Sequence, residues 1–130
     1  MVAQGSFDVK TLPLPSDDAI SGTAIRRYSL DKVFYGDLAG PSTGVMLGAG
    51  DPAKGTAGYV AMEYVTAILQ GRNGSFALQH FGTMSSTGFE LNISIAPGSG
   101  TGDLIGITGS MQIKNESGKH SYVLEYSLPA

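Results

Sequence analysis

The sequence contains no cysteine, and this absence removes several kinds of chemistry. Without cysteine the chain forms no disulfide, holds no thiolate-bound metal and has no thiol nucleophile. Charged residues make up only 15% of the 130 residues, and the formal net charge is -3. No basic patch is visible along the chain, which argues against binding to nucleic acid.

Long hydrophobic runs are also absent. No apolar run approaches the ~18 residues that a membrane helix needs. The N-terminus lacks the pattern of a positively charged segment followed by an apolar one, which is typical of a secretory signal. We therefore expect a cytoplasmic protein with no membrane partner. The two histidines and the scattered carboxylates show no metal-ligand spacing, so we expect no metal and no other cofactor.

What the sequence does contain indicates a single folded domain over residues 1–130. The length is typical of one domain that buries a core without disulfides. A hydrophobic content of 42% excludes a disordered chain. The 19 glycines are spread along the chain rather than repeated, and prolines are few. This combination predicts many turns and sharply bent strands.

The most informative stretch is the predicted hairpin Tyr59–Thr83. Two strand-like runs flank the segment Gly71–Gly74, which ends in Asn-Gly, the strongest short-range signal for a hairpin. If Gly71–Gly74 forms the loop, Glu63 lies opposite Gly82. A two-residue loop at Asn73-Gly74 shifts the pairing by two residues but leaves every side chain on the same face.

Glu63 and His80 share one face of this hairpin in either pairing. They are diagonal neighbours at ~7–8 Å between Cα atoms, close enough to share a ligand. A carboxylate and an imidazole can act as acid and base around a small polar substrate, so both are candidate catalytic residues. The alternative is a buried hydrogen bond that fixes the strand register. The rest of this face is apolar: Ala61, Val65, Ala67, Leu69, Phe76 and Leu78.

The opposite face of the hairpin is apolar as well. Its side chains are Val60, Met62, Tyr64, Ile68 and Phe81. If the Glu63 face lines the interior, these residues form an exposed apolar patch, and such patches usually mark protein contacts. We therefore expect a homo-oligomer that uses this wall. The alternative is that the faces are swapped and that Glu63 and His80 lie outside.

Alternating apolar residues predict further strands on both sides of the hairpin. The predicted segments are 1–15, 22–35 with a bend, 45–47, 89–96, 103–114 and 120–128. About eight strands with short links and no amphipathic helix indicate an all-β fold, an antiparallel meander closed into an eight-stranded barrel. Such a barrel holds side chains or one small ligand. A sandwich is the structural alternative.

A glycine-rich loop and three tyrosines are further candidate sites in the sequence. The glycine loop Pro97–Gly102 lacks the third glycine of a dinucleotide-binding fingerprint, because position 103 is Asp, and a strand is expected after it. It is therefore expected to be a turn, and no G-x-S-x-G nucleophile elbow is present. The hydroxyls of Tyr59, Tyr122 and Tyr126 are candidate ligand-binding groups, the alternative being core packing with each hydroxyl at the rim.

Four segments taken together resemble a small bacterial family of unknown function whose members look like the allene oxide cyclase barrel. The resemblance spans nearly the whole chain, Gly5 to Leu128. The segments are 32–38, 71–80, 97–106 and 121–126. The stretch Gly100–Leu104 is also similar to the glycine loop of dirigent proteins and plant allene oxide cyclases. Family members often carry a tryptophan in the preceding strand, where this chain has Asn92-Ile93-Ser94.

The resemblance implies a calycin-like barrel and an oligomer but no known reaction. The cyclases and dirigent proteins steer a reactive substrate by shape and a few polar groups, and the matching strand motifs here contain Glu63, Gln79 and His80. We expect a small apolar or amphipathic molecule to bind in the barrel lumen. The expected ligand-binding residues are Tyr59, Gln79, Tyr122 and Tyr126. The alternatives are a cofactor-independent cyclase or isomerase using Glu63 and His80, and a structural or protein-interaction barrel.

Overall fold

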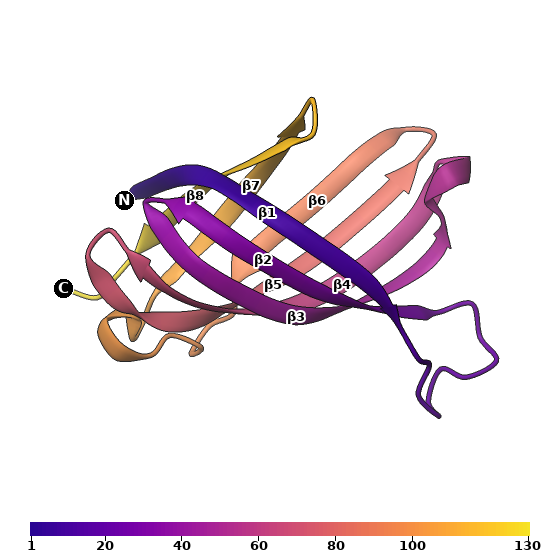
Figure 1. The fold of residues 1–130 in the computed structure, drawn as a ribbon, viewed down its shortest axis with the longest axis horizontal. Coiled ribbons are helices and arrows are strands. Elements are labelled where there is room, and N and C mark those ends of the chain that lie inside the picture. The colour runs from indigo at the N-terminus through magenta and orange to yellow at the C-terminus, as the bar shows by residue number, and fades with distance from the viewer.

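Eight antiparallel strands close into a barrel in the computed structural model, which describes residues 1–130. Each strand pairs with the next one along the chain, and β8 pairs back with β1 (Figure 1). The strands are β1 (Val2–Leu14), β2 (Arg26–Gly36), β3 (Leu38–Asp51), β4 (Thr56–Leu69), β5 (Arg72–Ser85), β6 (Gly88–Ile95), β7 (Thr108–Glu116) and β8 (Lys119–Ser127). The predicted meander barrel is confirmed, and the sandwich alternative is wrong.

Helices are limited to two short 3-10 turns, η1 (Pro52–Lys54) and η2 (Gly102–Leu104). None of the helices has the length and apolar character needed to cross a bilayer. The loop that carries η2 lies across one end of the barrel. Leu104 and Ile107 are buried in the core there, and the amide of Thr101 donates to the carbonyl of Ser75 at the start of β5. This end of the barrel is therefore closed by the chain itself.

Side chains of alternate residues fill the closed half of the barrel. The large buried side chains there are Phe34, Leu38, Leu69, Phe76, Leu104, Ile107 and Tyr122. The tyrosine ring meets Phe34 edge-on, with ring centroids 5.4 Å apart. Burial of each such side chain stabilises the fold by about 1.5–3 kcal/mol. The opposite end, where β4 begins and β5 ends, lies beside η1 and the β5–β6 turn (Figure 1).

The turn of the central hairpin differs from both expected loops. Leu69 pairs with Arg72, so the turn is Gln70-Gly71, with φ values of 47° and 86° as in a type I′ turn. Asn73-Gly74 lies inside β5 instead. A Cβ atom at Gly74 would lie 2.2 Å from the carbonyl oxygen of Thr101, so this glycine is needed for the close approach of the η2 loop rather than for a turn.

The new register keeps the predicted faces. Glu63 pairs with Leu78 rather than Gly82, a shift by an even number of residues, so the inward set is unchanged. Glu63 and His80 are 1% and 6% exposed and lie inside the barrel. The alternative in which these two residues lie outside is wrong.

Three other predicted strand boundaries were also wrong. β2 begins at Arg26 rather than Gly22, and β7 begins at Thr108 because residues 102–104 form η2. β3 runs for 14 residues, whereas a short strand at 45–47 was expected. Its glycines are part of the strand: a Cβ atom at Gly44 would lie 2.1 Å from the carbonyl oxygen of Met62, so only glycine lets β3 pack this closely on β4.

Candidate functional site

The carboxylate of Glu63 is the centre of a buried polar cluster inside the barrel. Its Oε1 accepts a hydrogen bond from Lys32 Nζ at 3.0 Å and lies 2.6 Å from His80 Nε2. Its Oε2 accepts from Ser42 Oγ at 2.6 Å. Lys32 comes from β2, Ser42 from β3, Glu63 from β4 and His80 from β5, so four successive strands each contribute one side chain.

The strand register places Glu63 and His80 together. Because Glu63 pairs with Leu78, His80 is two residues further along β5 and is the diagonal neighbour that the sequence predicts. An ionised carboxylate only accepts hydrogen bonds, so we assign the hydrogen between the two groups to His80 Nε2. In the neutral form of the ring, the other nitrogen, Nδ1, then carries a lone pair. Nδ1 has no hydrogen-bond partner within the protein, and the His80 side chain as a whole is only 3% exposed.

Lys32 completes the charge balance of the cluster. Its side chain is buried, and its ammonium nitrogen lies 4.8 Å from the centroid of the Phe7 ring and 5.6 Å from that of Phe34. A desolvated ammonium is attracted to aromatic faces at such distances. Together with the ion pair to Glu63, these contacts hold a lysine in the interior that would otherwise remain in water.

Lys32 and Ser42 are the cluster residues that the sequence analysis missed. A signal for Lys32 was present, since Leu30, Lys32 and Phe34 alternate on one side of β2 and the two apolar neighbours are buried. A lysine between inward apolar residues needs a buried anion, and Glu63 is the only carboxylate on an apolar wall. Ser42 had no comparable signal, because serine is common on either face of a strand.

The environment keeps Glu63 ionised. Burial alone would raise the pKa of its carboxyl, but the hydrogen bond from His80, the charge of Lys32 and the hydrogen bond from Ser42 together lower it to about 2. Glu63 is therefore a fixed anion at neutral pH and cannot deliver a proton. Its chemical role in the cluster is to orient the imidazole of His80 and to fix which nitrogen carries the hydrogen.

Tyr59 connects this cluster to a cavity at the open end of the barrel. Its ring centroid lies 6.4 Å from that of His80, and its ring packs over Gly82, where a Cβ atom would lie 2.3 Å from Tyr59 Cε1. Burial and the nearby charge of Glu63 raise the pKa of the Tyr59 hydroxyl, so it stays protonated. This hydroxyl has no hydrogen-bond partner within the protein and is free to bond a ligand.

The cavity has a volume of about 280 Å³ and a largely apolar lining. Its larger side chains are Arg26, Tyr28, Met46, Tyr59, Met84 and Phe89, and four glycines, at positions 48, 50, 58 and 82, make the room between them. Arg26 is the only charged residue of the lining, and it forms no ion pair with the protein. The cavity therefore offers apolar surface, one free phenol close to His80 and one free positive charge.

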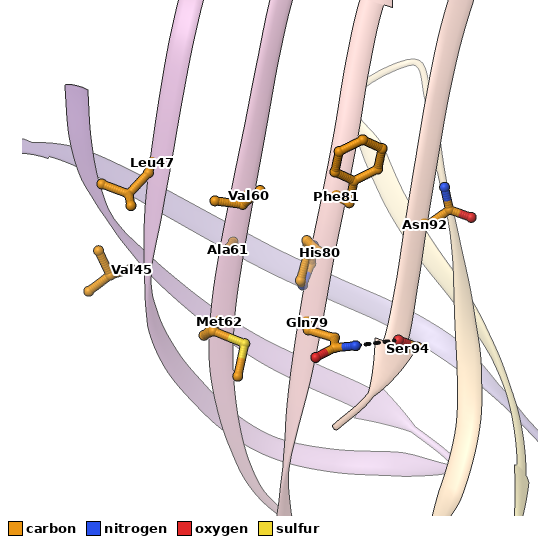
Figure 2. Close-up of a pocket in the computed structure, with 10 residues that line it drawn as sticks. All are labelled: Val45, Leu47, Val60, Ala61, Met62, Gln79, His80, Phe81, Asn92 and Ser94. Carbon is orange, nitrogen blue, oxygen red and sulfur yellow. Dashed lines mark hydrogen bonds between the residues drawn. The ribbon is translucent and has the colours of Figure 1, made fainter. Parts of the chain in front are cut away.

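The other predicted ligand-binding residues lie elsewhere. The hydroxyl of Tyr122 accepts from the amide of Leu38 at 2.9 Å and lies within hydrogen-bonding distance of two carbonyl oxygens, in the closed half. The hydroxyl of Tyr126 donates to Gln70 Oε1. Gln79 is on the outer surface, where its Nε2 donates to Ser94 Oγ (Figure 2). Of the six predicted site residues, the structure brings together Glu63, His80 and Tyr59.

Comparison with known proteins places the sequence in a family. The family model described as "Protein of unknown function (DUF3224)" matches residues 3–126. The chain belongs to this family. A DUF3224 protein of unknown function from Shewanella oneidensis MR-1, solved by crystallography, is 43% identical, with a TM-score of 0.89 over 100% of this chain and 98% of that chain. No curated protein matches. The expected family of unknown function is thus confirmed, and its likeness to allene oxide cyclase stays a prediction.

The cluster of this DUF3224 protein predicts strong coupling between Lys32 and Glu63. The variant Lys32→Met leaves a buried carboxylate without its counter-ion and is expected to lose about 3–5 kcal/mol of unfolding free energy. Glu63→Gln leaves the ammonium unpaired and is expected to lose a similar amount. In the double variant neither charge remains. Its loss of unfolding free energy, measured by urea unfolding, is therefore expected to be smaller than the sum of the two single losses by about 1–3 kcal/mol.

The matched control is Lys10→Met on the exposed part of β1, which is expected to change stability by no more than about 0.5 kcal/mol. Additive losses for the two cluster substitutions would contradict a buried ion pair.

The lowered pKa of Glu63 predicts a specific acid sensitivity. The folded-state pKa of about 2 lies below the ordinary value of 4.5, so the ionised form stabilises the fold above about pH 4.5, and this stability is lost as the pH falls toward 2. The ionised Glu63 contributes about 3 kcal/mol to the free energy of unfolding above pH 4.5. Urea midpoints measured across this range should fall more steeply for the wild type than for Glu63→Gln. Identical pH profiles would show that Glu63 is not held ionised in the folded state.

Proposed function

We propose that this protein binds a small, largely apolar molecule in the open end of the barrel. The observation that carries the proposal is the cavity of about 280 Å³ whose apolar lining includes Tyr59, the residue whose ring centroid lies 6.4 Å from that of His80. Ligand sites in proteins commonly combine a concave apolar surface with a few placed polar groups. The closed half of the barrel is filled by side chains, so the ligand occupies the open half alone.

The free polar groups of the cavity define the chemistry of the ligand. The Tyr59 hydroxyl donates a hydrogen bond to an acceptor such as a carbonyl, ether or hydroxyl oxygen of the ligand. Arg26 lies exposed at the mouth and is the only charge of the lining, so it favours a ligand with an anionic outer end. The expected ligand is therefore an amphipathic molecule whose apolar part points inward and whose acidic group remains at the rim.

A cofactor-independent isomerase or cyclase is the second candidate, and the unpaired Nδ1 of His80 favours it. In this mechanism Nδ1 takes a proton from the bound molecule and returns it at another atom of the same molecule, so no co-reactant is needed. Glu63 is a positioning residue that holds the imidazole, and Tyr59 stabilises negative charge on the ligand oxygen. Recovery of the bound molecule unchanged would favour a carrier, and recovery of its isomer an enzyme.

The cavity can be filled by substitution at one glycine. A Cβ atom at Gly48 would meet Tyr28 Cε2 at 3.8 Å and Tyr59 Cβ at 4.0 Å, ordinary contacts, so a side chain is accommodated and enters the cavity. With the anionic dye anilinonaphthalene sulfonate as the probe, Gly48→Leu is expected to weaken binding at least about tenfold, a change of about 1.4 kcal/mol in binding free energy. The melting temperature is expected to stay near that of the wild type.

Ala39→Leu, which enlarges an exposed residue of the same strand, is the matched control and should leave dye binding unchanged. Arg26→Gln should weaken this anionic dye but not an uncharged one. Equal dye binding by the wild type and by Gly48→Leu would overturn the lumen as the binding site. Native mass spectrometry of gently purified protein would then show no bound small molecule.

A further inference from the structure

The outer surface of three neighbouring strands carries no charge over most of its length. Within residues 38–50 of β3, all of β4 and residues 73–85 of β5, Glu63 and His80 are the only acidic or basic side chains. Both point into the barrel and are buried. The outward side chains of these three segments are therefore all neutral, and we name this surface the neutral face; Asp51, the last residue of β3, is exposed beyond its edge.

Large apolar side chains take the place of charges on the neutral face. Its exposed members are Val45, Leu47, Val60, Met62, Tyr64, Ile68 and Phe81, and each is between 37% and 53% exposed. Figure 2 shows Val45, Val60, Met62 and Phe81 projecting from adjacent strands around an open groove, with Gln79 and Ser94 at its border. Monomeric soluble proteins rarely expose a continuous apolar surface of this kind.

The charges of the protein are placed on other walls of the barrel. The exposed charged side chains of β1, β7 and β8 are Asp8, Lys10, Lys114, Glu116, Lys119 and Glu125. The wall formed by β1, β7 and β8 is therefore charged and exposed to solvent, whereas the neutral face is not charged. Since charged residues are depleted at the centre of protein interfaces, this asymmetry marks the neutral face as a contact surface.

We propose that the neutral face packs against the same face of a second copy of this chain. β3, β4 and β5 are each hydrogen-bonded on both sides, so the face offers no free strand edge to a peptide, and its occupant must lie flat on the side chains. An identical neutral face brings no like charges into opposition. A two-fold axis makes the same patch complementary to itself, the commonest arrangement among homodimers.

The size of the neutral face agrees with this occupant. Three strands of 14 residues span a wall of roughly 46 Å by roughly 14 Å at standard strand spacings. Two such walls in contact bury on the order of 1,300 Å², within the range of about 1,200–2,000 Å² that stable interfaces need. Two sheets pack face to face in this way at about 30° with interdigitating side chains.

The test is the molar mass in solution, measured by size-exclusion chromatography with light scattering. The wild type is expected to elute with twice the chain mass of 13.4 kDa. Met62→Lys places a charge at the centre of the neutral face in both copies and is expected to reduce the mass to that of one chain. Leu12→Lys, a similar change at an exposed residue of β1, is the control and is expected to leave the dimer intact.

A monomeric wild type would overturn the proposal, as would a Met62→Lys variant that keeps the wild-type mass. Co-elution of a different protein in place of a second copy would also overturn it. Because Met62 points away from the lumen, dye binding in the cavity should be the same in the Met62→Lys variant and in the wild type. The experiment on the dimer can therefore fail without affecting the proposal that the cavity binds a ligand.

Discussion

A carboxylate inside an apolar barrel is stable only while other groups compensate its charge, and this constraint organises the open half of the molecule. Glu63 on β4 takes its compensation from Lys32 on β2, Ser42 on β3 and His80 on β5. Removal of any charged partner would leave an uncompensated charge in a dry interior. The cluster therefore fixes the register of four strands and at the same time holds an imidazole next to Tyr59, which lines the cavity.

The barrel has two structurally different halves on either side of this cluster. In the closed half, η2 and large side chains such as Phe34 and Tyr122 fill the interior. The hydroxyl of Tyr122 already has hydrogen-bond partners there, namely backbone carbonyl oxygens and a backbone amide. In the open half, glycines replace side chains and leave the cavity above Tyr59. Small residues thus make the cavity, and aromatic residues such as Tyr28 and Tyr59 form part of its lining.

The sequence predicted the faces of the strands better than their ends. The alternation around Glu63 and His80 placed both residues inside because any even shift of the register preserves the face. The turn was misplaced because Gly74 is required by a contact with Thr101, 27 residues further along the chain, which local turn chemistry cannot reveal. Tyr122 and Tyr126 were expected at a ligand because a sequence does not show which hydroxyls already have backbone or side-chain partners. Lys32 was missed because its anion is 31 residues away.

The central interaction of the molecule is the hydrogen bond through which the ionised Glu63 orients the His80 ring, with the hydrogen on Nε2 and Nδ1 unpaired. The most direct measurement is nitrogen-15 NMR of the His80 ring in the folded protein, at a pH where the imidazole is neutral. The account predicts a hydrogen on Nε2 and a bare Nδ1, and a loss of this preference in Glu63→Gln. A ring with the hydrogen on Nδ1, or one whose state does not respond to Glu63→Gln, would contradict it.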